Sequence, residues 1–185
     1  MTDPLGFGNC IPAGKIMGCI TIDITDDADG QGYLFHAKRL AAPVHANTAE
    51  AVTNLLSCLH TLKQPAFLIG HGSRGQISTG CGLNMRICTQ DALLSTGNCD
   101  SFIGYCNTDR WKVPMSKLAG KISHLYLLGC YTGDGQQGLL FLNKLASIVK
   151  APVAAPTGYI TCLRGNFQLM DGSSWEVAFP EDTNK

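Results

Sequence analysis

Two short apolar segments, each ending beside a glycine and a reactive side chain, constrain the fold of this chain more than any other feature. Residues 66–69 (Ala-Phe-Leu-Ile) lead into Gly70-His71-Gly72, and residues 125–128 (Leu-Tyr-Leu-Leu) lead into Gly129-Cys130. Such runs are typical of strands that are buried on both faces of a parallel sheet. The carboxyl ends of parallel strands share one edge, where loops expose side chains for chemistry. The sequence therefore predicts His71 and Cys130 at the same edge, as a base and its nucleophile.

The size and composition of the chain indicate one globular domain. Its 185 residues are 45% hydrophobic, which suffices for one buried core and is short for two. We expect a single domain over residues 1–185, with a core from about 15 to 180 and tails at 1–14 and 181–185. Charged residues make up 15%, with 14 basic and 14 acidic side chains, so neither nucleic acid nor a membrane is a predicted partner. No segment approaches transmembrane length.

The nine cysteines are odd in number and scattered, which favours thiols in a reducing cytosol over a disulfide framework. The opening Met1-Thr2-Asp3-Pro4 has no basic region of the kind that begins a secretory signal, so we expect a cytoplasmic protein. A secreted form without its targeting segment is the alternative. Four widely spaced cysteines could each be a free thiol, part of a disulfide or a metal ligand, and the sequence does not decide between these: Cys81, Cys88, Cys99 and Cys106. That spacing is wider than in zinc knuckles, and we predict no metal and no cofactor.

Strand and helix patterns alternate along the chain, as in α/β proteins. The pattern at residues 15–24 and near 32–36 favours an N-terminal hairpin over a βαβ unit. Asn47 is an expected N-cap, with Glu50 at the capping-box position and apolar residues at helical spacing through Leu62.

The middle of the chain, residues 72–107, has the composition of loops with a small hairpin formed by 76–79 and 85–89. Pro114 and Gly120 bound one or two predicted helical turns. A longer helix is expected over 136–149, followed by a strand at 153–155. Strands at 167–170 and 175–179 flank Asp171-Gly172, which predicts a C-terminal hairpin.

The chemistry of a thiol explains why glycines and a histidine belong beside Cys130. A cysteine with a pKa of about 8.5 is only a few per cent thiolate at neutral pH, so it needs a base or local positive potential. The helix expected soon after Cys130 supplies some of that potential at its N-terminus. Glycine permits close approach of backbone and substrate, and the backbone amides of Gly72 and Cys130 are candidate donors to an oxyanion.

Four segments in order resemble the caspase-like (clan CD) cysteine peptidases. These are residues 67–75 (FLIGHGSRG), 125–133 (LYLLGCYTG), 138–142 (GLLFL) and 151–158 (APVAAPTG). The similarity is closest to bacterial CHAT-type and separase-like domains with His-Gly-Ser and Gly-Cys motifs. His71 lies 59 residues before Cys130, near the spacing of about 50 in the caspase signature.

This resemblance implies a three-layer α/β/α sandwich with a mainly parallel central sheet. It also implies His71 as general acid and base, Cys130 as nucleophile, and the amides of Gly72 and Cys130 as the oxyanion hole. The predicted activity is that of a cysteine endopeptidase that cleaves peptide bonds through an acyl-enzyme thioester. A non-catalytic protein-interaction module of the same fold is the alternative.

The expected partners are a protein or peptide substrate and a regulatory protein, or processing, that orders the loops between Gly75 and Asn107. Four uncharged residues are candidate walls of the pocket for the residue before the scissile bond (P1), and they favour a neutral side chain: Tyr131, Thr132, Thr157 and Tyr159. Asp26, Asp27 and Asp109 are the candidates that would instead select a basic residue.

Overall fold

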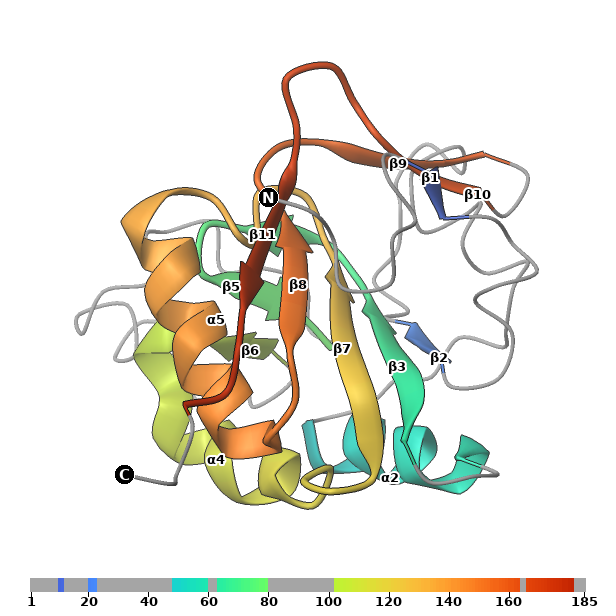
Figure 1. Ribbon diagram of the computed structural model, residues 1–185, viewed down its shortest axis with the longest axis vertical. Helices are drawn as coiled ribbons and strands as arrows, with labels where there is room; N and C mark the ends of the chain where they lie inside the picture. Colours follow the sequence, from blue (N-terminus) through green and yellow to red (C-terminus); the bar gives the residue numbers. More distant parts are fainter. Residues whose placement is uncertain are drawn as a thin grey trace.

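The computed structural model describes residues 10–11, 20–22, 48–59, 63–79, 102–163 and 166–181. Its centre is a five-stranded sheet with the order β11-β8-β7-β3-β2 (Figure 1). The bounds of these strands, in chain order, are β2 (Ile20–Ile22), β3 (Gln64–Ile69), β7 (Ile122–Leu128), β8 (Val153–Pro156) and β11 (Trp175–Ala178). Strand β11 is antiparallel to β8, and the other neighbours are parallel. The mainly parallel α/β sheet expected from the sequence is therefore confirmed.

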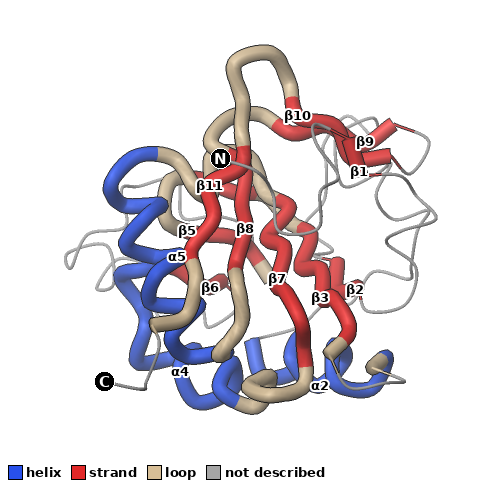
Figure 2. The backbone as a smooth tube through the Cα atoms, in the orientation of Figure 1, coloured by secondary structure: helices blue, strands red, loops and turns tan. Residues whose placement is uncertain are grey.

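Three described helices pack together on one face of this sheet. They are α2 (Thr48–Cys58), α4 (Thr108–Ser116) and α5 (Gly135–Val149). Apolar residues of all three helices and of four central strands form one buried cluster. In Figure 2 the helices lie away from the second, smaller sheet described next.

The other face of the central sheet is covered by strands. A three-stranded sheet with the order β1-β10-β9 combines β1 (Cys10–Ile11), β9 (Ile160–Leu163) and β10 (Asn166–Leu169). Residues of β9 and β10 share a second buried cluster with β3, β7, β8 and β11. Within the described residues the layers are therefore helix, sheet and sheet, and a second helical layer of the expected α/β/α sandwich is not found among them.

Alternation along β3 and β7 explains why the last four residues of each strand are all apolar. Ala66 and Leu68 point into the helical cluster, whereas Phe67 and Ile69 point into the cluster under the small sheet. The same alternation holds along β7, where Tyr126 stacks on Phe67 with ring centroids 5.3 Å apart. Successive side chains of a strand point to opposite faces of the sheet. Where both faces are buried, every side chain is therefore apolar, and polar and apolar residues do not alternate.

The third sheet, which also has three strands, begins just after the end of β3. It pairs β4 (Gly72–Ser73) with β5 (Gln76–Ser78) and β5 with β6 (Phe102–Gly104). The short helix η2 (Tyr105–Asn107) follows, and the buried Trp111 of α4 donates from Nε1 to the Gly104 carbonyl at 2.7 Å. The small hairpin expected at 76–79 has its first strand in β5, while the second, at 85–89, lies outside the described residues.

The predicted C-terminal hairpin is wrong in its pairing. Both strands exist, but β10 pairs with β9 and β1, and β11 pairs with β8 in the central sheet. The turn at Gly172, with a φ of 81°, therefore connects two different sheets. Local turn chemistry indicated where the chain reverses. The pairing of β11 with β8 instead buries Trp175 and Val177 in the cluster between the central sheet and the small sheet.

The N-terminal expectation and the helical turns near Pro114 also need revision. Strand β2 is parallel to β3 and α2 lies between them in the chain, so this part contains a βαβ connection. The other expected hairpin strand, near 32–36, lies outside the described residues, as does Asn47. Helix α4 begins at Thr108, so Pro114 lies inside the helix, near its end, and does not start it.

No helix in the described ranges is both long and apolar enough to cross a bilayer.

Candidate functional site

The pairing of β3 with β7 determines where His71 and Cys130 lie. The two strands are parallel neighbours, and their last paired residues are Ile69 and Leu128. Gly70 continues this ladder by donating to the Leu128 carbonyl at 3.4 Å. His71 and Cys130 each follow two residues after the final pair. Both therefore leave the sheet at the same edge and at equivalent positions on adjacent strands, and both are half-buried.

Glycines bring the two loops into direct contact just beyond the sheet. A Cβ on Gly72 would lie 2.6 Å from the Cys130 carbonyl oxygen, and a Cβ on Gly129 would lie 3.0 Å from the Cα of Gly72. No larger residue fits at either position without moving backbone. The His-Gly and Gly-Cys motifs thus form one packed unit, in which each glycine allows the approach of the other loop.

Thr132 joins the loop after β3 to the loop after β7. Its buried hydroxyl donates to the Gln76 carbonyl at 3.2 Å, and its own carbonyl accepts from the Gly75 amide at 3.1 Å. The Nε of Arg74 adds an ion pair with Asp134 at 2.6 Å. Because the Thr132 side chain lies in the interior, it braces the two loops and does not face a substrate.

The Cys130 thiol lies at the border of the cluster under the small sheet. Its Sγ is 3.5 Å from the carbonyl oxygen of Ile160, the first residue of β9. Burial raises the pKa of Cys130, and hydrogen bonding to the backbone at Ile160 and at Cys130 itself offsets part of that effect. The resting side chain is therefore a neutral thiol at neutral pH, so attack on a substrate requires a base.

Tyr131, directly after the thiol, adopts a strained backbone conformation. Its φ is 58°, in the left-handed region that costs a non-glycine residue roughly 1–2 kcal/mol. The Tyr131 amide donates to the Gly158 carbonyl at 2.9 Å, and its carbonyl accepts from Asp134 at 3.0 Å. These contacts hold a sharp turn between β7 and α5, of a kind that clusters at functional sites.

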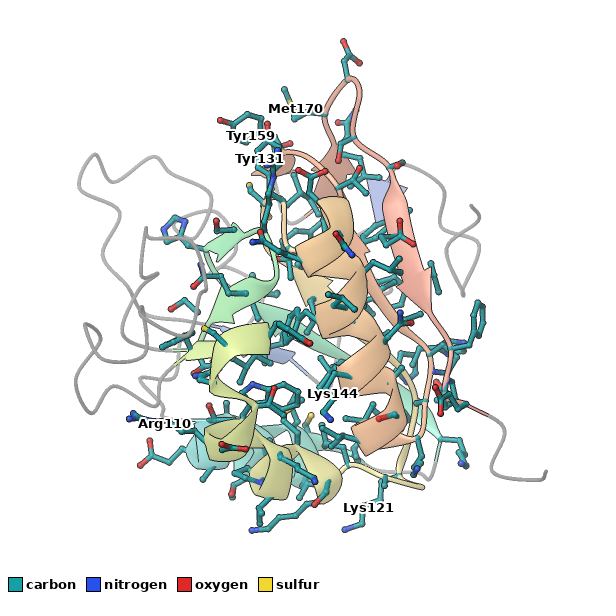
Figure 3. All side chains as sticks on the ribbon, turned by 90° about the vertical axis from the view of Figure 1, so that its left-hand side faces the viewer. Arg110, Lys121, Tyr131, Lys144, Tyr159 and Met170 are labelled. Carbon is teal, nitrogen blue, oxygen red and sulfur yellow. The ribbon has the colours of Figure 1, made fainter. Side chains whose placement is uncertain are left out.

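The other expected pocket walls lie close to this turn. The rings of Tyr131 and Tyr159 meet edge to face with centroids 4.8 Å apart, and Figure 3 shows both at the same end of the molecule. Burial raises the pKa of Tyr131, with further contributions from Tyr159, Asp134 and the charge of an ionised Cys130. The Thr157 hydroxyl is 3.1 Å from the Ser174 hydroxyl and accepts a hydrogen bond from the Ser174 amide. Both contacts attach Thr157 to the turn before β11.

Of the candidate acidic residues, the structure describes only Asp109. Asp26 and Asp27 lie outside the described residues, and Asp109 is exposed in the first turn of α4. No group of three or more His, Cys, Asp or Glu side chains suited to a metal ion occurs in the described part of the chain.

The structure decides the state of one of the four cysteines that the sequence left open. Cys106 is disulfide-bonded. Cys81, Cys88 and Cys99 lie outside the described residues. Cys58, Cys130 and Cys162 are thiols. The wide spacing of the middle cysteines left the disulfide open from sequence alone.

Sequence reasoning did not find the contacts of Ile160 and Met170 with this site. Ile160 contributes only a backbone oxygen, which no side-chain pattern reveals. Met170 donates its amide to the Tyr159 carbonyl at 3.0 Å, across a pairing of β9 and β10 that the sequence did not predict.

A search of protein-family models, curated proteins and solved structures found no match to this chain. The resemblance to caspase-like peptidases therefore remains an expectation from the sequence motifs around His71 and Cys130.

Proposed function

We propose that this protein is a cysteine peptidase that uses Cys130 as nucleophile and His71 as general acid and base. The observation that carries the proposal is the register of β3 and β7, which puts the two residues at equivalent positions beyond adjacent parallel strands. The contact of Gly72 with the Cys130 backbone supports it, because the two motifs form one unit. A half-buried thiol at a loop edge, beside a strained turn, is suited to attack on an external substrate.

The proposed reaction begins with a neutral thiol, because burial raises the pKa of Cys130. His71 accepts the thiol proton while Sγ bonds to the substrate carbonyl carbon, and the carbonyl oxygen becomes an oxyanion. The amides of Gly72 and Cys130 are the proposed donors to that oxyanion. His71 then gives the proton to the leaving amine, which breaks the C–N bond and leaves a thioester. Water, deprotonated by His71, hydrolyses the thioester and regenerates the thiol.

Replacement of each dyad member tests this proposal. His71→Gln should lower peptide hydrolysis by roughly 10²–10⁴-fold, the typical contribution of acid–base catalysis. Cys130→Ala should lower it at least as much, because it removes the nucleophile, and neither variant should lose the fold by circular dichroism. Cys58→Ala is the matched control, because Cys58 is also a half-buried thiol that donates to a backbone carbonyl. Equal activity of the Cys130 and Cys58 variants would refute the assignment.

A non-catalytic interaction module of the same fold is the second candidate. The observation in its favour is the raised pKa of Cys130, which leaves the thiol unreactive at rest. A peptide electrophile distinguishes the two functions. If the protein is a peptidase, the electrophile acylates Cys130 and His71→Gln slows this acylation. If it is an interaction module, His71→Gln leaves the rate of acylation unchanged.

A further inference from the structure

Three exposed or half-buried side chains gather beside the candidate nucleophile and form an apolar surface. This rim cluster consists of Tyr131, Tyr159 and Met170, which Figure 3 shows together at one end of the molecule. Tyr159 is 61% exposed and Met170 is 47% exposed, although both are large and apolar. Exposed apolar side chains that adjoin one another mark binding surfaces more often than scattered ones do.

The backbone ties the rim cluster to Cys130. Tyr131 follows Cys130 directly, and Tyr159 precedes Ile160, whose carbonyl lies 3.5 Å from Cys130 Sγ. The Tyr159 carbonyl accepts from the Met170 amide at 3.0 Å, so the third member is attached to the second. A ligand that contacts Tyr131 and Tyr159 therefore lies close to the thiol, because Tyr131 adjoins Cys130 and Tyr159 adjoins Ile160, the residue that Cys130 Sγ contacts.

The left-handed turn at Tyr131 explains how its ring reaches Tyr159. The hydrogen bond from the Tyr131 amide to Gly158 brings the loop after β7 against the loop after β8. The two rings then meet edge to face, which is the arrangement that aromatic pairs prefer. A third aromatic ring can join such a pair in the same geometry.

Charged groups near the cluster give little support for a charged ligand. The Asp134 carboxylate already pairs with Arg74. Asp171 follows Met170 but is exposed to solvent, where an ion pair contributes little. The described lysine and arginine side chains labelled in Figure 3 (Arg110, Lys121 and Lys144) lie toward the other end of the molecule.

We propose that Tyr131, Tyr159 and Met170 bind an aromatic or long apolar side chain of a peptide, at the residue that precedes the bond attacked by Cys130. This specificity rests on the proposed peptidase function and narrows its substrate class from neutral to aromatic or long apolar. A Phe or Leu side chain buries its surface against the two rings and the thioether, whereas Arg or Asp would lose water without gaining a partner.

A panel of fluorogenic peptides that differ only at P1 tests the specificity. We expect kcat/KM to be highest for Phe, Tyr, Leu or Met and lower for Ala, Gln, Arg and Asp. Tyr159→Ala should lower the ratio of kcat/KM for Phe over Ala substrates by about three- to tenfold, the range for loss of one aromatic contact. Tyr159→Phe should preserve that ratio, because the ring remains.

Phe179→Ala is the matched control for the loss of an exposed aromatic ring. Phe179 is 63% exposed, and it follows Ala178, which pairs with Val153. Val153 begins β8, so Phe179 lies near the end of the central sheet opposite to the one where Cys130 lies. The control should leave the Phe over Ala ratio unchanged. Tyr131→Gly, which suits a positive φ, provides a second variant in case Tyr159→Ala does not fold.

The failures of the two proposals are distinguishable. Turnover with a preference for Arg that Asp171→Asn abolishes would overturn the apolar specificity and keep the peptidase function. An equal loss on all substrates in Tyr159→Ala would also overturn it. Absence of turnover on every peptide, with Cys130 acylated at a rate independent of His71, would refute the peptidase function and with it the specificity.

Discussion

Gly72 is the residue through which the two motifs depend on each other. Besides the Cys130 carbonyl, a Cβ at this position would meet the Thr132 hydroxyl and the Gly129 carbonyl carbon. None of the backbone atoms among these can move without shifting the loop that carries the thiol. The glycine after His71 is therefore required by the close approach of two loops, whatever chemistry the histidine performs.

The protonation state of Cys130 gives a testable dependence on pH. Because burial raises its pKa, the thiolate fraction is small at neutral pH and increases with alkaline pH. The rate of Cys130 alkylation by iodoacetamide should therefore rise by about tenfold per pH unit between pH 7 and 9, followed by mass spectrometry of the Cys130 peptide. A plateau that begins below pH 7 would contradict this, because it would mean a resting thiolate paired with a protonated histidine.

At the scale of elements, the β3 and β7 loops are held by contacts of unequal strength. The Arg74 side chain is 63% exposed, so its ion pair with Asp134 is expected to contribute no more than about 1 kcal/mol. The Thr132 hydroxyl is buried, and Thr132→Val would leave the Gln76 carbonyl without this donor. That change is expected to cost about 1–3 kcal/mol.

We therefore expect Thr132→Val to lower the free energy of unfolding more than Arg74→Ala does. Urea titrations of both variants and the parent protein measure the difference. High salt should weaken the effect of Arg74→Ala and leave that of Thr132→Val nearly unchanged, because screening acts on exposed charges. The reverse order of the two variants would show that the ion pair, and not the hydroxyl, holds the loops together.

The elements with a strong apolar period were predictable from sequence, and those defined by distant partners were not. Strands β3 and β7 were predicted from their continuous apolar runs, and helix α5 from apolar residues at helical spacing. Helix α4 was missed at its start because its buried side chains are only Trp111 and Met115, at a spacing of four, and Pro114 suggested an initiation site. Its position depends on packing against α2 and α5.

The candidate site shows the same division. His71 and Cys130 were identified from local motifs, since each follows an apolar run and adjoins a glycine. The thiol's contact with Ile160 and the position of Met170 depend on where β9 and β10 lie. The positive φ of Tyr131 accompanies a hydrogen bond to Gly158, in the loop after β8. The Asp171-Gly172 signature pointed to the wrong partner for β10, because turn residues report a reversal and carry no information about long-range pairing.

At the scale of the whole molecule, the disulfide at Cys106 links the site to the redox environment. Cys106 lies in η2, which the Tyr105 amide attaches to the Gly75 carbonyl at 3.0 Å, in the loop that follows His71. The Asn107 side chain fixes the same segment through bonds to Gly104 and Phe102, each 2.9 Å long. One end of the disulfide therefore lies in a segment that hydrogen bonds attach to the loop after His71.

This arrangement opposes the expectation of a reducing compartment, because disulfides rarely persist in a reducing cytosol. For protein produced under oxidising conditions, peptide mapping without reductant should find Cys106 in a disulfide, whereas Cys58, Cys130 and Cys162 should be alkylated after denaturation. Dithiothreitol should lower the free energy of unfolding by about 2–4 kcal/mol, measured by urea titration. Cys106→Ser is the control, because the stability of this variant should lack the part of the response to reductant that comes from the Cys106 disulfide. Full alkylation of Cys106 in the oxidised protein, with no effect of dithiothreitol on stability, would contradict the disulfide and restore the interpretation of the chain as a protein of reduced thiols.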